Sequence, residues 1–167
     1  MDSRAQQLVN SLKLTPHPEG GWYREVYRSP LDVAPHDTRS PRSALTSIYF
    51  LIESGQFSRW HKVLSDEVWI HLEGAPLELW EWDAETSEAL CTTLGPLDFS
   101  ADIKPQHVIP AGIWQAARPR HASSASFTLV TCVVAPGFDF TDFSMMDPAG
   151  LEARQIGRDW PDLACLV

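Results

Sequence analysis

Most of the chain alternates between apolar and polar residues with a period of two, which indicates β-strands with one buried face. The stretch SDEVWIHLEGAPLELWEW, residues 65–82, is the clearest example, because its carboxylates and its histidine alternate with tryptophans and aliphatic residues. Comparable short segments follow one another at intervals of about 8 to 12 residues, separated by Gly, Pro, Asp and Ser. They are WYREVYR, ALTSIYFLI, FSRWHKV, ALCTTLG, QHVIPAG, IWQAARP and SFTLVTCVV. This pattern predicts an all-β sandwich or barrel.

The two ends of the chain depart from this alternation. Leu8, Val9 and Leu12 lie at helical spacing and predict a short N-terminal helix that runs to about Leu12. Toward the other end we expect an irregular C-terminal tail, in which DPAGLEARQI forms one short helix with Pro148 near its start. No internal repeat or linker divides the sequence, so residues 1–167 are expected to form a single domain.

The charge balance limits the partners of the protein. Lys and Arg number 13 against 22 Asp and Glu, which gives a formal net charge of −9 and a pI near 5.0. Nucleic acids and anionic membranes require a basic face, so neither is an expected partner. No apolar run approaches the roughly 18 residues that span a bilayer, and MDSRAQQLVNSLKL has no signal-peptide core. We therefore expect a cytoplasmic protein.

The three cysteines, Cys91, Cys132 and Cys165, indicate no disulfide framework and no zinc site, because their number is odd and no two are close in sequence. Cys132 lies in the apolar segment FTLVTCVVA. A thiol in such a strand is expected to be buried and structural.

Two sets of residues at regular spacing carry the candidate chemistry. In the first, glycine, histidine, glutamate and glycine are separated by five, five and six residues; in the second, the pattern is Pro-x-Gly-x-x-Gln. The positions are Gly55, His61, Glu67 and Gly74, followed by Pro110, Gly112 and Gln115. This spacing resembles the two motifs of the cupin superfamily, which read Gly-x5-His-x-His, three or four residues, Glu-x6-Gly, and Pro-x-Gly-x-x-His.

A narrower resemblance covers nearly the whole chain. The segments HPEGGWYREVYRS, TSIYFLIESGQFSRWHKVLSDEVWIHLEG, VIPAGIWQAA and LVTCVVAPGFDFTDF are similar to cupin family 5, a group of compact RmlC-like cupins. The resemblance implies a cupin double-stranded β-helix, that is, a small jelly-roll barrel, with His61 and Glu67 in its mouth. It also implies a homodimer.

The sequence departs from the full cupin metal site of three histidines and one glutamate. Val63 and Gln115 stand at two of the histidine positions, so His61 and Glu67 alone match. Transition metals in proteins usually have three or more protein ligands. No cofactor is therefore expected to be required. A divalent metal held by His61, Glu67 and Gln115, or with His71 as a substitute ligand, is the alternative.

A glutamate beside a histidine in a partly apolar cup can serve as an acid–base pair. The resemblance to RmlC-like cupins, which act without metal, then implies an isomerase, epimerase or lyase for a small polar, sugar-like substrate, with His61 and Glu67 as catalytic residues. Two alternatives remain open: a metal-dependent oxygenase or hydrolase, and a protein that binds a ligand without chemistry. His61 and Glu67 also fit a purely structural pair.

The aromatic residues near this pair are candidates for substrate binding. Trp69 is placed to stack on a flat ligand, and alternation puts His71 on the same strand face as Glu67. Trp114, or else Trp60, would frame the mouth, and Gln115 would position the substrate.

The segment HPEGGWYREVYRS contributes the last candidates. Strict alternation puts Arg24 and Arg28 on one face of a strand and Glu25 on the other. Arg24 is expected either to reach an anionic substrate, because its guanidinium matches a carboxylate or phosphate, or to form an edge ion pair or dimer contact. His17 is predicted to be structural, and the phenylalanines of APGFDF are predicted to lie in the core.

Overall fold

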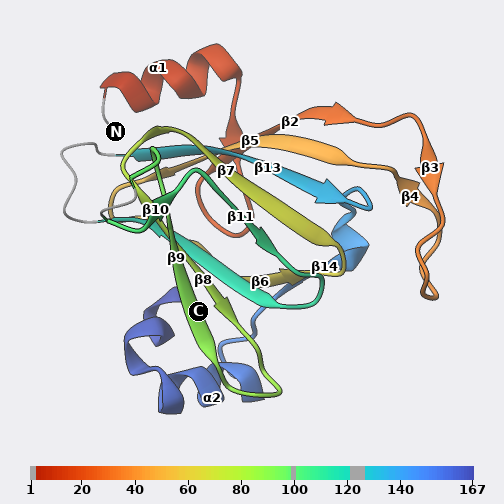
Figure 1. The fold of residues 1–167 in the computed structure, drawn as a ribbon, viewed down its shortest axis with the longest axis vertical. Helices are drawn as coiled ribbons and strands as arrows, with labels where there is room; N and C mark the ends of the chain where they lie inside the picture. Colours follow the sequence, from red (N-terminus) through yellow and green to blue (C-terminus); the bar gives the residue numbers. More distant parts are fainter. Residues whose placement is uncertain (1–2, 99–100, 121–126) are drawn as a thin grey trace.

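The computed structural model describes residues 3–98, 101–120 and 127–167. Within them, two six-stranded sheets lie face to face, and helices cover their outer surfaces (Figure 1). The first sheet has the order β1-β2-β5-β13-β7-β11, with bounds Thr15–Pro16, Trp22–Arg28, Thr46–Glu53, Phe127–Ala135, Asp66–Gly74 and Gln106–Ile109. The second has the order β10-β9-β8-β12-β6-β14, with bounds Ile103–Lys104, Ala89–Leu94, Leu77–Trp82, Trp114–Pro119, Ser58–Val63 and Phe143–Met145. The predicted all-β jelly-roll architecture is confirmed.

The chain crosses repeatedly between the two sheets, and the sheet pairs are antiparallel except for β9 and β10. A further pair of short strands, β3 (Asp32–Val33) and β4 (Arg42–Ser43), forms an arm that extends to one side of the body (Figure 1). It lies in the proline-rich segment RSPLDVAPHDTRSPRS, residues 28–43.

The space between the sheets holds one apolar cluster, formed by the inward positions of alternating strands. Phe50 and Ile52 of the first sheet meet Leu77, Leu79 and Leu94 of the second. These side chains are almost fully buried. Alternation in the sequence therefore reports which face of each strand looks inward.

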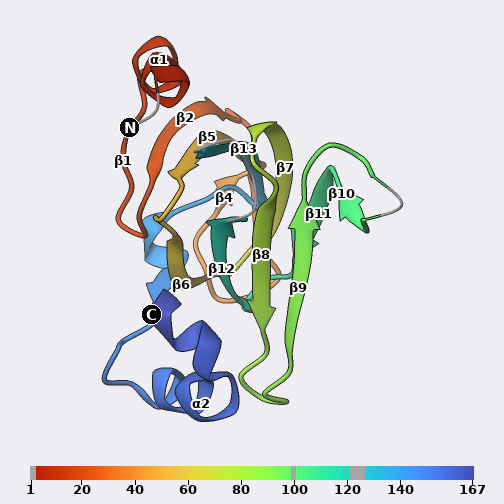
Figure 2. The same ribbon diagram turned by 90° about the vertical axis from the view of Figure 1, so that its left-hand side faces the viewer.

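The outer face of each sheet is also covered (Figure 2). Helix α1 (Ser3–Leu12) packs on the first sheet, where Ala5, Leu8 and Val9 contact Leu51 and Phe127. The second sheet has an outer cluster of tryptophans, which the C-terminal residues cover. Its members include Trp60, Trp82, Trp114, Ile156, Leu163 and Leu166.

The C-terminal tail is more regular than its sequence pattern indicates. Helix α2 (Leu151–Asp159) begins within DPAGLEARQI, as predicted, but extends three residues beyond it, and a 3₁₀ helix, η2 (Pro161–Leu166), follows. A second 3₁₀ helix, η1 (Phe140–Asp142), precedes β14. None of the helices in the described part of the chain is long and apolar enough to cross a bilayer.

Candidate functional site

A cavity of about 490 Å³ opens between the two sheets at the ends of β2, β6 and β14. Its interior carries polar side chains, its rim carries charged ones and its wall is largely aromatic. The interior residues are His17, Glu19, His61 and Glu67; the rim residues are Glu25, Arg28 and Asp139; the wall includes Tyr23, Ile48, Phe50, Phe138, Phe140 and Phe143. Such a concave apolar site with a few convergent polar groups is typical of small-molecule pockets.

Glu19 lies at the centre of the polar interior. Its Oε2 is 3.3 Å from Nε2 of His61 and 3.4 Å from Nδ1 of His17, and its Oε1 accepts a hydrogen bond from the Ser58 hydroxyl at 2.8 Å. Glu19 and His61 are 5% and 2% exposed. One buried carboxyl group therefore contacts two imidazoles at once.

The hydrogen bonds around His61 fix its neutral tautomer. Nδ1 of His61 is 2.7 Å from the carbonyl oxygen of Arg59, and a carbonyl can only accept, so Nδ1 carries the proton. Nε2 is then a lone-pair acceptor that faces Glu19. A protonated Glu19 carboxyl satisfies this acceptor, whereas a carboxylate would leave two acceptors facing each other.

The acid–base properties of the interior agree with this arrangement. Burial raises the pKa of Glu19 to about 8, against the lesser effects of the Ser58 hydrogen bond and the charge of Arg59. Burial lowers the pKa of His17 to about 4, and it lowers the pKa of His61 as well. At neutral pH the site therefore holds a protonated carboxylic acid next to two neutral imidazoles.

Glu67 belongs to a second hydrogen-bonded chain on the opposite wall. The indole N–H of Trp69 donates to Oε1 of Gln115 at 2.9 Å, and Nε2 of Gln115 donates to Oε2 of Glu67 at 2.6 Å. Because an indole is only a donor, it fixes the orientation of the Gln115 amide. Burial raises the pKa of Glu67, although His61, Gln115 and the Cys132 thiol each act to lower it.

This chain bears on the alternative of a metal held by His61, Glu67 and Gln115. The amide oxygen of Gln115 accepts from Trp69 and its nitrogen faces Glu67, and Gln115 is not among the residues that line the cavity. In the part of the chain that the structure describes, no group of three or more His, Cys, Asp or Glu side chains has a metal-binding arrangement. The predicted ligand set does not fit a transition metal, and no step is assigned to one.

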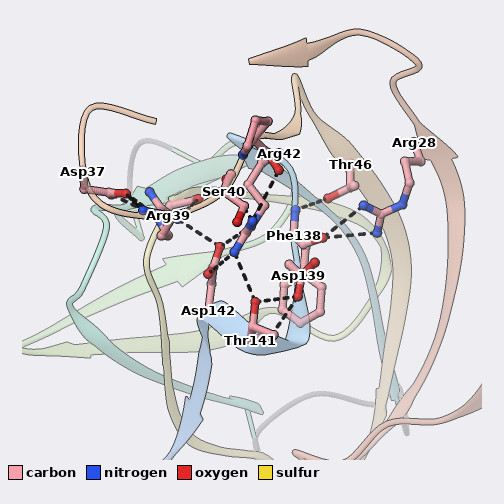
Figure 3. Close-up of polar contacts among 12 residues, drawn as sticks. Arg28, Asp37, Arg39, Ser40, Arg42, Thr46, Phe138, Asp139, Thr141 and Asp142 are labelled. Carbon is pink, nitrogen blue, oxygen red and sulfur yellow. Dashed lines mark hydrogen bonds and ion pairs between the residues drawn. The ribbon is translucent and has the colours of Figure 1, made fainter. Parts of the chain in front are cut away.

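Residues 138–143 carry Asp139 of the rim and three phenylalanines of the wall, and this segment is held from several sides (Figure 3). Asp142, which is buried, pairs with Arg42 at 2.8 Å and with Arg39 at 3.0 Å, and these two residues belong to the β3–β4 arm. The backbone N–H of Phe138 donates to the Thr46 hydroxyl at 2.9 Å. The arm therefore holds the rim in place.

The arginine at the rim is Arg28, and the placement of Arg24 is a correction. Arg24 does not line the cavity; its Nη1 donates to the carbonyl oxygen of Leu12 at 3.1 Å. The pairing of β2 with β5 shifts register between Glu25 and Tyr27. This β-bulge adds one residue, so Glu25 and Arg28 share the cavity face that strict alternation had separated.

Three further predicted substrate contacts are not formed at this cavity. Trp69 lies in the core between the sheets, where it contacts Phe50 and donates to Gln115, and it does not line the cavity. His71 is bound through Nε2 to the carbonyl oxygen of Ala75 at 3.1 Å. Trp114 points to the opposite side of its strand, into the cluster with Trp60 under the C-terminal helices. Alternation places Trp114 opposite to Gln115, and the second sheet buries both of its faces.

Glu19 was not predicted from the sequence, and His17 was predicted to be structural, yet both line the cavity. The signal that identifies them is the loop HPEGG, which lies within the family-like segments. Gly20 and Gly21 have φ angles of 111° and 69°, a backbone conformation that favours glycine, and it turns Glu19 inward. Phe138 and Phe140, predicted as core, line the cavity instead.

The same loop also borders a second hollow of about 470 Å³, here named the outer groove. It is lined by Pro16, His17, Glu19, Gly20, Gly21, Trp22, Gly55, Gln56, Phe57 and Arg59. His17 and Glu19 therefore have the cavity on one side and the outer groove on the other.

Comparison with known proteins defines the class. Residues 6–146 match Cupin_5, described as Cupin superfamily (DUF985). The chain belongs to this family, which confirms the resemblance seen in the sequence.

Individual relatives agree with this assignment. The chain is 26% identical to the uncharacterized protein YML079W of Saccharomyces cerevisiae over 156 residues, which cover 86% of this chain and 76% of the yeast protein. A hypothetical protein from Leishmania major superposes with a TM-score of 0.82 at 28% identity, covering 98% of this chain and 96% of that one. Protein SO0799 from Shewanella oneidensis gives a TM-score of 0.78 at 31% identity, covering 98% and 94%.

Proposed function

We propose that this cupin is a proton-transfer enzyme of the isomerase, epimerase or lyase type that acts on a small polar molecule, such as a sugar derivative, without a metal. The observation that carries the proposal is the contact of 3.3 Å between Glu19 and His61, both of which line one cavity together with Glu67. Both an acid and a base are therefore present in a space that fits one small molecule.

The two carboxyl groups take different roles because Gln115 donates a hydrogen bond to Glu67, which favours its ionised form, whereas Glu19 faces the lone pair of His61. Glu67 in its ionised form accepts a proton from a carbon next to a carbonyl group, and Glu19, protonated and hydrogen-bonded to His61, donates a proton to the carbonyl oxygen. The product is an enol or enediol. Return of a proton to a different carbon, or to the other face of the same carbon, gives an isomer or an epimer. In a lyase reaction, the group on the next carbon leaves with its bonding electrons and takes the proton from Glu67, while Glu19 takes back the enol proton. Positioned acids and bases of this kind contribute about 10²- to 10⁴-fold each.

The proposal predicts exchange of a carbon-bound hydrogen with solvent. The protein is incubated in D₂O with aldoses, ketoses and amino sugars, and loss of the proton signal next to the carbonyl is followed by NMR. We expect exchange with the wild type and a rate at least about 100-fold lower for Glu67→Gln. Glu85→Gln, an exposed residue of the β8–β9 turn, is the matched control and should exchange like the wild type.

The alternatives give different results in the same assay. Ligand binding without exchange, unchanged in Glu67→Gln, would identify a binding protein instead of an enzyme. Exchange that is abolished by dialysis against a chelator and restored by a divalent metal would identify a metal-dependent cupin. The predictions of a homodimer and of a cytoplasmic location stay predictions.

A further inference from the structure

The charges around the cavity restrict the kind of molecule that it can take. The described lining residues include four carboxyl groups, those of Glu19, Glu25, Glu67 and Asp139, against one guanidinium group, that of Arg28. The two lining histidines, His17 and His61, are neutral at pH 7 because burial lowers their pKa. Glu19 is also uncharged at pH 7, because burial raises its pKa to about 8, and the charge of Glu25 is paired with that of Arg28. The negative charge that is left in the cavity is that of Asp139, together with that of Glu67 when it is ionised.

Four of the five N–H groups of Arg28 already donate to protein oxygens, and its charge acts on Glu25 and Asp139. Its Nε and Nη2 donate to the two carboxylate oxygens of Glu25 at 3.0 and 2.7 Å. Its Nη1 and Nη2 also donate to the carbonyl oxygen of Phe138 at 3.2 and 3.1 Å (Figure 3). A phosphate or carboxylate would have to displace Glu25 before it reached this guanidinium.

Asp139 supplies a negative charge that remains open to a ligand. Its Oδ1 accepts from the backbone N–H and the hydroxyl of Thr141 at 2.9 and 2.7 Å, which lowers the pKa of this carboxyl and keeps it ionised. Among the described residues, no donor is hydrogen-bonded to Oδ2. Because the rim is fastened by Asp142 and Phe138, the position of this carboxylate is fixed before a ligand arrives.

The wall beside Asp139 is made of aromatic rings that suit a cation. Phe138, Phe140 and Phe143 pack edge to face, with ring centroids 5.0 to 6.0 Å apart. His17 lies against the same group, 6.2 Å from Phe140 in a stacked arrangement. Aromatic faces attract ammonium groups through the ring quadrupole. An ammonium group near the rim would meet this wall and the Asp139 carboxylate together.

We propose that the substrate of this cavity is a small cation, with an ammonium group seated between Asp139 and the phenylalanine wall, and not a sugar phosphate or a nucleotide sugar. The inference rests on the proposed function for the reaction, but the charge selection follows from the rim alone. It replaces the predicted role of Arg24 in binding an anionic substrate.

A matched set of three fragments tests the charge selection. Benzylamine, benzyl alcohol and benzoate share one ring and differ in the charge of the head group. Their dissociation constants are measured at pH 7 by ligand-observed NMR titration on the full chain. We expect benzylamine to bind about three- to fivefold more tightly than benzyl alcohol, and benzoate more weakly than both.

Two rim variants show which group is responsible. Asp139→Asn should reduce the preference for benzylamine over benzyl alcohol to near onefold. Glu25→Gln should free Arg28 and make benzoate binding measurable. Glu85→Gln removes the same charge from the distant β8–β9 turn and should leave all three constants unchanged. Thermal unfolding of each variant checks that it is folded.

The outcomes separate this inference from the proposed reaction. Equal affinity for all three fragments, tightest binding of benzoate, or no binding of any fragment would overturn the cationic substrate. A preference for benzylamine that Asp139→Asn removes would support it, even if deuterium exchange fails and the proposed reaction is rejected. Deuterium exchange on neutral sugars without any preference for benzylamine would keep the reaction and reject the cation.

Discussion

The pKa of Glu19 is set by what surrounds its carboxyl group and not by its place in the sequence. It is buried, and its close contacts are a hydroxyl and two imidazoles, none of which is a permanent cation. Removing a carboxylate from water without a cationic partner disfavours the charged form. The same burial keeps His17 and His61 uncharged, so all three groups are neutral at pH 7.

The protonation of Glu19 makes the stability of the folded protein depend on pH. The pKa of Glu19 is about 8 in the folded protein and 4.5 ordinarily, so the folded state binds more protons between these values and stability falls as pH rises. His17 acts oppositely, because its folded pKa of about 4 lies below its ordinary 6.5, and its contribution is complete above pH 6.5. Between about pH 6.5 and 8 we therefore expect a fall of up to about 1.4 kcal/mol per pH unit from Glu19.

Glu19→Gln removes the titrating group and should flatten this part of the profile. The measurement is the free energy of unfolding by urea at several pH values between 6.5 and 8. Glu85→Gln, which is exposed, should retain the wild-type slope. A Glu19→Gln slope equal to that of the wild type would show that Glu19 is already ionised at pH 6.5.

At the scale of elements, the rim shows which features a sequence pattern can predict and which it cannot. Alternation identified β2 as a strand, but it could not place the extra residue of the β-bulge, and the assignments of Arg24, Glu25 and Arg28 to faces of the strand depend on that one residue. The motif spacing found His61 and Glu67, which lie on strands near each other in sequence. Glu19 reaches them from a loop about 40 residues earlier, and only the closing of the sheets brings the two together.

The fastening of the rim by the β3–β4 arm leads to a prediction about Asp142. Asp142→Asn removes the charge that two partly buried guanidinium groups share, those of Arg39 and Arg42. We expect a loss of about 3 kcal/mol in the free energy of unfolding. We also expect weaker benzylamine binding, because Asp139 lies in the same segment and would lose its fixed position. Urea unfolding and the NMR titration measure the two effects.

Asp37→Asn is the control within the same network. Asp37 is half-exposed and pairs with the arm's own Arg39, at 2.9 Å. An exposed pair of this kind is worth about 0 to 1 kcal/mol. If Asp142→Asn cost no more than Asp37→Asn, the arm would not be what holds the rim.

At the scale of the whole molecule, the second sheet has apolar side chains on both faces, and the C-terminal residues cover those on its outer face. Trp60 donates its indole N–H to the carbonyl oxygen of Leu163 at 3.1 Å, while the neighbouring His61 faces the cavity. One face of strand β6 thus packs in the outer tryptophan cluster, and the other face contributes to the candidate site. The family-like motifs predicted the jelly roll, but the tail lacks strand alternation, and nothing in it identifies the tryptophans that it covers.

This division predicts that damage to the outer cluster affects stability without changing ligand selection. Ile156 of α2 is fully buried, and Ile156→Ala should cost about 2 to 5 kcal/mol in the free energy of unfolding. Leu151 of the same helix is 74% exposed, and Leu151→Ala should change the free energy of unfolding by no more than about 0.5 kcal/mol. Below their unfolding temperatures, both variants should keep the fragment preference of the wild type. A changed preference in Ile156→Ala would show that the two faces of β6 are coupled.

The HPEGG loop separates the cavity from the outer groove by a single thickness of chain. A side chain at Gly20 would clash with the carbonyl oxygen of Phe57, and one at Gly21 would come within 2.7 Å of the carbonyl oxygen of Leu51. Neither glycine can therefore be replaced by a larger residue without moving the backbone. The loop that carries the acid of the candidate site thus lines both hollows. A compound designed for the outer groove would act on Glu19 without competing with substrate, and such inhibition would appear as a lower turnover at unchanged apparent affinity.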